Sequence, residues 1–391
     1  MINHSTPDQY ASLMNALETH RLIVCCGAGG VGKTTTSAAL ALAAARQGKR
    51  VLALTIDPSK RLAQTLGVNK NEPKPVLLDR NRLDQLGVPK QGELHAWLLD
   101  PQIISDQVVN AEAGDQAENL KKNLIYQQIS GIVAGMQEYT AVEALHQFLS
   151  DQRFDLIILD TPPSRHALRF IDSPDRVASF LDKRIFRLFV PKRNSLISKM
   201  AAKVIDEVLD RAFGKVTSAE LKQFFELFSR LLDHLNQNQQ EMAKVFQAED
   251  VAFFLVTTAR QDAIDEAKRF AQEIKNRHLN LGGFLLNRYP IKLDHPVSLS
   301  ELNERFDELL DSAKESINAP VASTQSLREL FNEILISTQT SHELRRSTEQ
   351  VLNALGHVYR LKELQGDAST LEGISQLTEQ LMGMPQALKE S

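Results

Sequence analysis

Residues 27–35, Gly-Ala-Gly-Gly-Val-Gly-Lys-Thr-Thr, constrain this chain more than any other segment. They satisfy the pattern G-x-x-x-x-G-K-[ST], with an apolar run at residues 22–26 before them and an alanine-rich stretch after them. Glycines at these positions let successive backbone N–H groups turn toward a phosphate, and a helix that starts at the loop points its positive end at the same anion. Strand, loop and helix together predict a phosphate-binding loop, and the alternative is a glycine-rich turn without a ligand.

The loop offers both backbone and side-chain groups to a nucleotide. We expect Lys33 to place its ammonium at the β- and γ-phosphates and the Thr34 hydroxyl to ligate Mg²⁺. The helix is predicted over residues 33–47, with Gly48 as its stop. The complete predicted binding set of the loop is Gly27, Gly29, Gly30, Val31, Gly32, Lys33, Thr34 and Thr35.

Composition favours a cytoplasmic enzyme with a large core. The chain has 391 residues, of which 42% are hydrophobic, and its net charge of −4 gives no global electrostatic reason to expect nucleic acid as a partner. Residues 1–7 lack the plan of a signal peptide, and no segment approaches the ~18 uninterrupted apolar residues of a membrane span. Cys25 and Cys26, the two cysteines, are adjacent in a predicted strand and should point to opposite faces, so we expect neither a disulfide nor a shared metal between them.

Alternating strand and helix patterns predict an α/β fold. Near-continuous apolar strands separated by helices are typical of a parallel sheet covered on both faces. We therefore predict a doubly wound, mainly parallel sheet with the nucleotide at the carboxyl ends of its strands. Besides the run at 22–26, the predicted strands are residues 50–57, 154–160, 251–257 and 283–287.

Helical periodicity replaces the strands in two long stretches, at about residues 100–150 and 176–248. We predict that these stretches are insertions into a nucleotide-binding domain of residues 20–330 and that together they form a helical subdomain. Residues 331–391 are predicted to be a C-terminal helical extension. Within the second insertion, residues 181–204 carry seven basic side chains against Asp182 alone, which fits either an anionic membrane surface or acidic partner, or an ordinary solvated helix face.

Two carboxylates follow apolar strands and are candidates for the chemistry. Asp160 ends the run Leu-Ile-Ile-Leu, as a Walker-B aspartate does, and is expected to support Mg²⁺ opposite Thr34. Asp57 ends the strand expected beside the loop strand. Its carboxylate either orients or deprotonates the attacking water, or caps a helix that begins at Pro58.

Three segments resemble the ArsA/GET-type ATPases, which belong with MinD and ParA among the dimerising NTPases that have a deviant Walker A loop. They are residues 27–36, 57–62 (Asp-Pro-Ser-Lys-Arg-Leu) and 160–169 (Asp-Thr-Pro-Pro-Ser-Arg-His-Ala-Leu-Arg). The family patterns for the last two are D-P-A-H-[NS]-L and approximately D-T-A-P-T-G-H-T-L-R. The resemblance covers roughly residues 20–330.

The resemblance implies a P-loop ATPase that binds ATP, ADP and Mg²⁺. It implies that Asp57 activates water and that Asn287, at the end of a strand, contacts the adenine near residues 320–322. It further implies a homodimer whose nucleotide state controls its conformation or its binding of a client. A protein client or a membrane-surface partner would then bind through the helical subdomain.

The departures from the family pattern concern charge at the phosphates. The family loop reads K-G-G-V-G-K-T, and its first lysine reaches the partner subunit's nucleotide, whereas this chain has Ala28 at that position. Lys60, Arg61 and Arg165 are cations where the family has none, and Arg165 is our candidate to supply the missing charge as an arginine finger does. The alternative for these cations is solvent-facing charge in loops.

Two functions therefore remain open. Asp57 and Asp160 favour an ATP-hydrolysing switch, and Ala28 favours a nucleotide-binding scaffold with negligible hydrolysis. Because no cysteine lies beyond Cys26, the arsenite site and the C-x-x-C zinc clasp of characterised members are both excluded.

Overall fold

The structure of the protein is a computed structural model. The described residues are 7–56, 66–67, 72–122, 137–162, 237–238, 240–289, 303–309, 312, 326–333, 346–364 and 366–383, with isolated positions at 207, 210–211, 214, 218 and 221.

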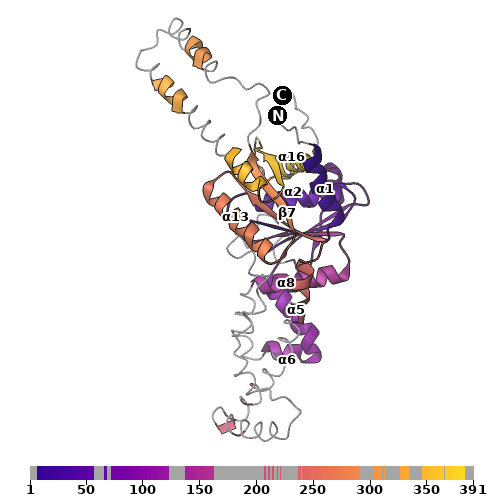
Figure 1. Cartoon of the computed structure of the whole chain (residues 1–391). Helices are drawn as coiled ribbons and strands as arrows, with labels where there is room; N and C mark the ends of the chain where they lie inside the picture. The colour runs from indigo at the N-terminus through magenta and orange to yellow at the C-terminus, as the bar shows by residue number, and fades with distance from the viewer. Residues whose placement is uncertain are drawn as a thin grey trace.

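An eight-stranded sheet forms the centre of the molecule (Figure 1). Its order is β3-β4-β2-β5-β1-β6-β7-β8, and every neighbouring pair is parallel except β3 with β4. The predicted doubly wound, mainly parallel sheet is thereby confirmed. The strands are β1 (Leu22–Gly27), β2 (Arg50–Thr55), β3 (Val76–Leu77), β4 (Glu93–Leu98), β5 (Leu156–Asp160), β6 (Val251–Thr257), β7 (Leu281–Tyr289) and β8 (Val358–Lys362).

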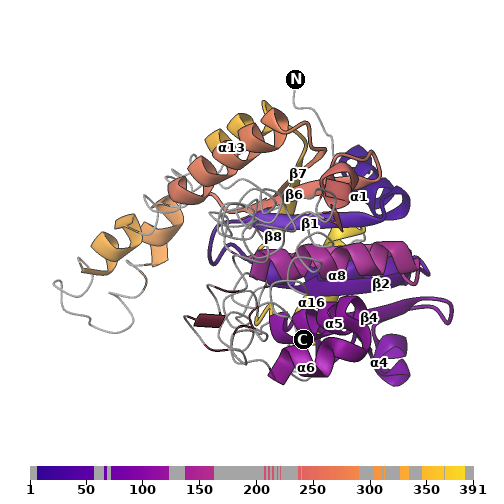
Figure 2. The same cartoon turned by 90° about the horizontal axis from the view of Figure 1, so that it is seen from below.

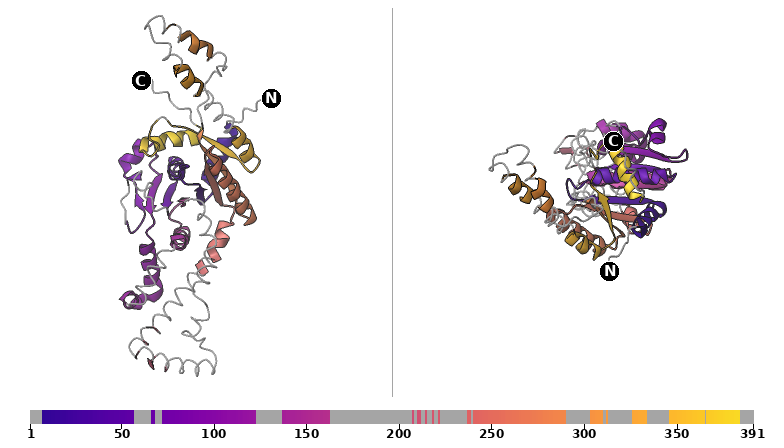
Figure 3. Two further views of the ribbon diagram at one scale, coloured as in Figure 1. Left: turned by 90° about the vertical axis from the view of Figure 1, so that its left-hand side faces the viewer. Right: turned by 90° about the horizontal axis from the view of Figure 1, so that it is seen from above.

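Helices cover both faces of the sheet. Seen from below, α5 and α8 lie in front of the strands (Figure 2), and seen from above, the yellow helix α16 covers the opposite side (Figure 3). The helices are α1 (Pro7–Thr19), α2 (Lys33–Arg46), α4 (Arg80–Gln85), α5 (Pro101–Ala113), α6 (Ala117–Lys122), α8 (Gln137–Asp151), α13 (Gln261–Asn276) and α16 (Leu371–Leu381), with a 3-10 turn at Gly114–Gln116.

Alternate side chains of β1 separate the core into two clusters. Val24 and Cys26 pack with α5, α8 and most of α13, whereas Ile23 and Cys25 pack with α1, α2 and α16. The two cysteines thus point to opposite faces, as the period of a strand requires. Burial raises the pKa of Cys26 to about 12 and that of Cys25 further, so both thiols stay protonated and inert as metal ligands or nucleophiles.

Small side chains explain how α2 fits between the sheet and α16. Its alanines are almost completely buried, and they let both the sheet and α16 approach the helix backbone closely. The Thr378 hydroxyl of α16 donates to the Ala39 carbonyl oxygen over 3.2 Å. The helix ends at Arg46, and Gly48 follows with φ +88°, so its predicted extent and its glycine stop are confirmed.

The C-terminal prediction needs correction. Residues 331–391 are not only a helical extension, because β8 is a strand of the central sheet and α16 packs on the helix that follows the phosphate loop. The nucleotide-binding fold therefore continues past residue 330. Burial explains the difference: β8 lies beside β7, where Val358, Tyr359 and Leu361 join the core instead of covering a helix face.

The helices α5, α6 and α8 lie in the stretch at about residues 100–150 that is predicted to be a helical insertion, and α5 and α8 pack against the sheet. In Figure 1, α6 lies below α5 and α8. Most of the second insertion, including the basic segment at 181–204, lies outside the described residues. Within the described part of the chain, no helix combines the length and apolar character needed to cross a membrane.

His95, in the middle of β4, makes stability depend on pH. Its side chain is buried, its Nε2 lies 2.9 Å from a Glu93 carboxylate oxygen, and its Nδ1 has no hydrogen-bond partner among the described residues. Burial lowers the pKa of His95 despite the opposing effect of Glu93. The unfolded chain therefore takes up a proton near pH 6.5 that the folded protein accepts only at lower pH, and stability falls as pH falls below that value.

His95→Gln should remove this dependence, because glutamine keeps a donor for Glu93 and does not titrate. We expect denaturant unfolding between pH 7 and pH 5.5 to show a steeper loss of stability for the wild type than for the variant. One proton limits the difference to about 1.4 kcal/mol per pH unit. Identical pH profiles would show that His95 is protonated equally in the folded and unfolded states.

Candidate nucleotide-binding site

The loop at the end of β1 has the backbone geometry of a phosphate cradle. Gly30 and Gly32 have φ of +76° and +93°, a region that favours glycine. A Cβ at Gly27 would lie 2.1 Å from the Val256 carbonyl oxygen, whereas Gly29 and Gly30 have open space on that side. The loop therefore packs tightly against β6 at its start and leaves its middle open to a ligand.

Lys33 begins α2 and turns its charge back over this loop. Its side chain is 6% exposed, and its Nζ donates to the Ala28 carbonyl oxygen over 2.9 Å. The ammonium thus lies at the N-terminal end of α2, where the helix dipole also favours an anion.

Asp160 is the point at which three elements of the site meet. It ends β5, which lies between β1 and β2 in the sheet, and its side chain is completely buried. The expectation that the strand before Asp57 lies beside the loop strand is therefore wrong, because β5 separates β2 from β1. Its Oδ2 accepts hydrogen bonds from Thr34 Oγ1 over 2.9 Å and from Thr55 Oγ1 over 3.1 Å. Ser37 Oγ of α2 donates to Oδ1 at 3.5 Å. The structure therefore brings the two residues predicted for the metal, Thr34 and Asp160, into direct contact.

The sequence pattern did not identify Thr55 and Ser37. Thr55 is a polar residue that follows four apolar residues of β2, and the register of β2 with β5 places it beside Asp160. The first five residues of α2 are a lysine followed by four residues with hydroxyl side chains, and Ser37 is the last of them. Thr161 matches the family pattern but had no predicted role; its Oγ1 donates to the Cys25 carbonyl oxygen over 2.8 Å and holds the chain after Asp160 against β1.

The donor atoms around Thr34 fit Mg²⁺. This ion prefers oxygen ligands and is usually held by one or two protein groups together with water and phosphate oxygens. The described residues contain no cluster of three or more histidine, cysteine, aspartate or glutamate side chains that would hold a metal without such help. One hydroxyl and one carboxylate, 2.9 Å apart at a phosphate loop, are the set expected for a nucleotide-bound magnesium ion.

Asn287, near the end of β7, lies against the loop. Its Nδ2 donates to the Val31 carbonyl oxygen over 2.9 Å, and its Oδ1 accepts from the Arg288 backbone N–H over 2.9 Å. The side chain thus belongs to the site that contains the phosphate loop, and both ends of its amide are engaged by protein groups.

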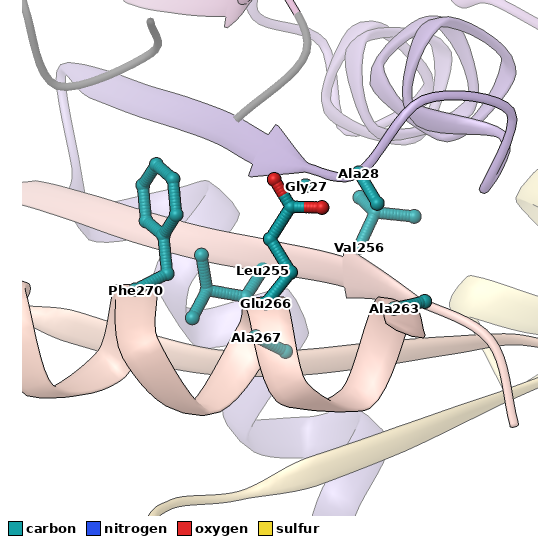
Figure 4. Close-up of a pocket in the computed structure, with 8 residues that line it drawn as sticks. All are labelled: Gly27, Ala28, Leu255, Val256, Ala263, Glu266, Ala267 and Phe270. Carbon is teal, nitrogen blue, oxygen red and sulfur yellow. The ribbon is translucent and has the colours of Figure 1, made fainter. Parts of the chain in front are cut away.

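Ala28 packs into the wall of the site. Its side chain is 8% exposed and belongs to the same core cluster as Val31 and Ala263 of α13. Figure 4 shows the small pocket behind it, into which Glu266 of α13 points its carboxylate toward Gly27 and Ala28. A buried methyl group cannot place positive charge on a phosphoryl group, so any such charge must come from another residue.

Several predicted residues lie outside the described part of the chain: Asp57, Lys60, Arg61, Arg165 and residues 320–322. The described residues that precede Asp57 and Arg165 in the sequence lie at this site. The Ile56 N–H donates to the Asp160 carbonyl oxygen over 3.1 Å, so Asp57 follows directly after a residue held at this edge. Arg165 is three residues beyond Pro162, the last described residue of the loop that follows Asp160.

Comparison with known proteins agrees with this geometry. The family described as anion-transporting ATPase matches residues 20–295. The ATPase get3 of Schizosaccharomyces pombe is 25% identical over 344 residues, which cover 83% of this chain and 94% of that protein. The ATPase get3 of Schizosaccharomyces japonicus is 24% identical over 83% of this chain and 96% of its own length. ATPase ASNA1 homolog 1 of Paramecium tetraurelia is 30% identical over 44% of this chain and 50% of its own. With the phosphate loop, the buried aspartate and the parallel sheet, the match over residues 20–295 shows that the chain belongs to the anion-transporting ATPase family and is an ATPase of that family.

Proposed function

We propose that this ATPase binds Mg²⁺ with ATP or ADP at residues 27–35 and uses hydrolysis to switch its conformation, its assembly or its binding of a protein client. The observation that carries the proposal is the pair of hydrogen bonds from Thr34 and Thr55 to the buried carboxylate of Asp160. A loop, a strand end and a carboxylate joined in this way bring the phosphate site and the metal site to one point of the sheet. A change in the bound phosphate at this point acts on β1, β2 and β5 together.

Each residue of the proposed site has a distinct role. The loop amides and Lys33 bind the phosphates, and Thr34 and Asp160 hold Mg²⁺, which neutralises charge on the phosphates when it is bound. Asp57 accepts a proton from the attacking water or orients that water. Arg165 supplies the positive charge that Ala28 cannot supply.

A scaffold that binds nucleotide with negligible hydrolysis is the second candidate. The burial of Ala28 favours it, because the position that carries a cation in the resembling family is part of the core here. In that case nucleotide would stabilise the fold by binding alone. The two candidates differ in whether the chain turns over ATP, and they share the same binding residues.

The switch is expected to be visible in assembly. We propose a homodimer in which the two nucleotide sites face each other, and a partner surface on the helical subdomain that includes α5 and α6. Light scattering should report a dimer with ADP, with a non-hydrolysable ATP analogue, or with both. Lys33→Ala, which lacks the charge needed to hold phosphate, is the control and should not respond to either nucleotide. A wild type that stays monomeric under both conditions would rule out the dimer.

A further inference from the structure

Three hydroxyl groups donate to the carboxylate of Asp160. Thr34 and Thr55 both donate to Oδ2, over 2.9 and 3.1 Å, and Ser37 donates to Oδ1 at 3.5 Å. Thr34 and Ser37 belong to α2, whereas Thr55 belongs to β2, which pairs with β5 on the side opposite to β1. Of these three donors, Thr55 therefore holds Asp160 from a second element of the fold.

The shared acceptor links the position of Thr34 to that of Thr55. A carboxylate oxygen accepts about two hydrogen bonds, so these two hydroxyls together orient Oδ2 of Asp160. A hydroxyl has a single proton, and Thr34 uses its proton in this bond, so the lone pairs of its oxygen are the part that a metal ion can use. By orienting the acceptor, Thr55 determines the direction in which the Thr34 hydroxyl is turned.

The structure around Thr55 keeps its hydroxyl in place. The residue is 2% exposed, it ends a strand inside the sheet, and branching at Cβ restricts the rotation of its side chain. The Leu99 N–H donates to the Thr55 carbonyl oxygen over 3.0 Å. The Ile56 N–H donates to the Asp160 carbonyl oxygen over 3.1 Å. Because these backbone bonds do not involve the side chain, the hydroxyl can be removed while the strand pairing is kept.

A second threonine in the sheet provides a comparison. Thr257 ends β6, which lies beside β1 on the side opposite to β5, and it is 1% exposed. Its Oγ1 donates to the Thr258 carbonyl oxygen over 3.3 Å, whereas the register of β2 with β5 places Thr55 opposite Asp160. The two threonines thus share burial and a place at the carboxyl end of a parallel strand, and they differ in the group to which they donate.

We infer that Thr55 is a positioning residue for Mg²⁺, which acts through Asp160 and touches neither the ion nor the nucleotide. This inference rests on the proposed function, in which Thr34 and Asp160 hold the metal. Partners behind metal-binding side chains fix the orientation of those side chains, and their loss typically weakens metal binding by about 10- to 100-fold. The loop amides and Lys33 are proposed to bind the phosphates, so Thr55 contributes nothing to the binding of nucleotide without metal.

The test separates the metal from the phosphates. Calorimetric affinities for ADP are measured in excess Mg²⁺ and in EDTA, for the wild type and for three variants. Thr55→Val removes the hydroxyl and keeps the branched shape of the side chain, and Thr55→Ser keeps the hydroxyl. Thr257→Val removes the matched hydroxyl at the end of β6.

We expect Thr55→Val to bind ADP about 10-fold more weakly than the wild type in Mg²⁺ and equally well in EDTA. Thr55→Ser and Thr257→Val should resemble the wild type in both conditions. If Thr55→Val does not fold, Thr55→Ala carries the same expectation.

Three results would overturn the inference. Equal weakening of Thr55→Val in Mg²⁺ and in EDTA would show that Thr55 supports the loop in general. Wild-type affinity of Thr55→Val in both conditions would show that Asp160 does not need this hydroxyl. Weak binding in Mg²⁺ by Thr55→Ser as well would show that the hydroxyl is not the group responsible. A wild type that binds ADP equally well with and without Mg²⁺ would instead contradict the metal site itself, and the inference with it.

Discussion

Lys33→Ala is expected to abolish measurable nucleotide binding while leaving the protein folded. The ammonium lies at the loop with 6% of the side chain exposed, and no other charged side chain belongs to the loop sequence. Charge-assisted hydrogen bonds contribute about 1.5–3 kcal/mol each, so loss of two bonds to phosphate oxygens weakens binding by at least about 100-fold. Calorimetric titration with MgADP gives the measurement.

Lys49→Ala is the matched control for this variant. Lys49 follows the opposite end of α2, where its Nζ donates to the Glu18 carbonyl oxygen, far along the helix from the phosphate loop. Its removal should leave nucleotide affinity unchanged. Binding of MgADP by Lys33→Ala with wild-type affinity would mean that the loop does not hold phosphate through this lysine.

Arg165→Ala is expected to lower kcat by about 10³-fold or more with little change in KM. Position 28 supplies no charge, Arg165 is five residues after Asp160 in the sequence, and Thr161 holds the chain directly after Asp160 against β1. A guanidinium there would bridge two phosphate oxygens as they gain charge, and this interaction is stronger in the transition state than in the bound ground state. Steady-state ATP hydrolysis measures both constants.

The neighbouring cations provide the comparison for Arg165. Lys60→Ala and Arg61→Ala remove positive charge from the segment after Asp57, and we expect a smaller effect from each. Arg165→Lys should recover only part of the lost activity, because an ammonium lacks the planar fork of a guanidinium. Wild-type hydrolysis by Arg165→Ala would show that the charge comes from elsewhere or is not needed.

The central strands could be predicted because burial on both faces leaves a simple pattern. β1, β2, β5, β6 and β7 are near-continuous apolar runs, which are typical of a covered parallel sheet. The strand β4 is interrupted by His95, which is buried through pairing with Glu93, so its sequence does not present such a run. The strand β8 has five residues between helical patterns and was assigned to the wrong class of structure.

The contact between Thr34 and Asp160 could likewise be expected, since Thr34 comes soon after β1 and Asp160 ends β5, and the carboxyl ends of these parallel strands share one edge of the sheet. The contributions of Thr55 and Ser37, and the hydrogen bond between Asn287 and Val31, could not. They depend on the register of β2 with β5, on side-chain rotamers in α2 and on the irregular end of β7. Such features arise from tertiary packing and leave no periodic signal in the sequence.

Single-turnover hydrolysis tests the central claim most directly. With Mg²⁺ present and the protein in excess over ATP, the wild type is compared with Asp57→Asn. This substitution keeps the shape of the side chain and removes its basicity. Loss of a general base costs about 10²- to 10⁴-fold in rate, so we expect the wild type to convert bound ATP to ADP and the variant to bind ATP but convert it at least about 100-fold more slowly. Equal, near-zero rates in both proteins would contradict the enzyme and leave the nucleotide-binding scaffold.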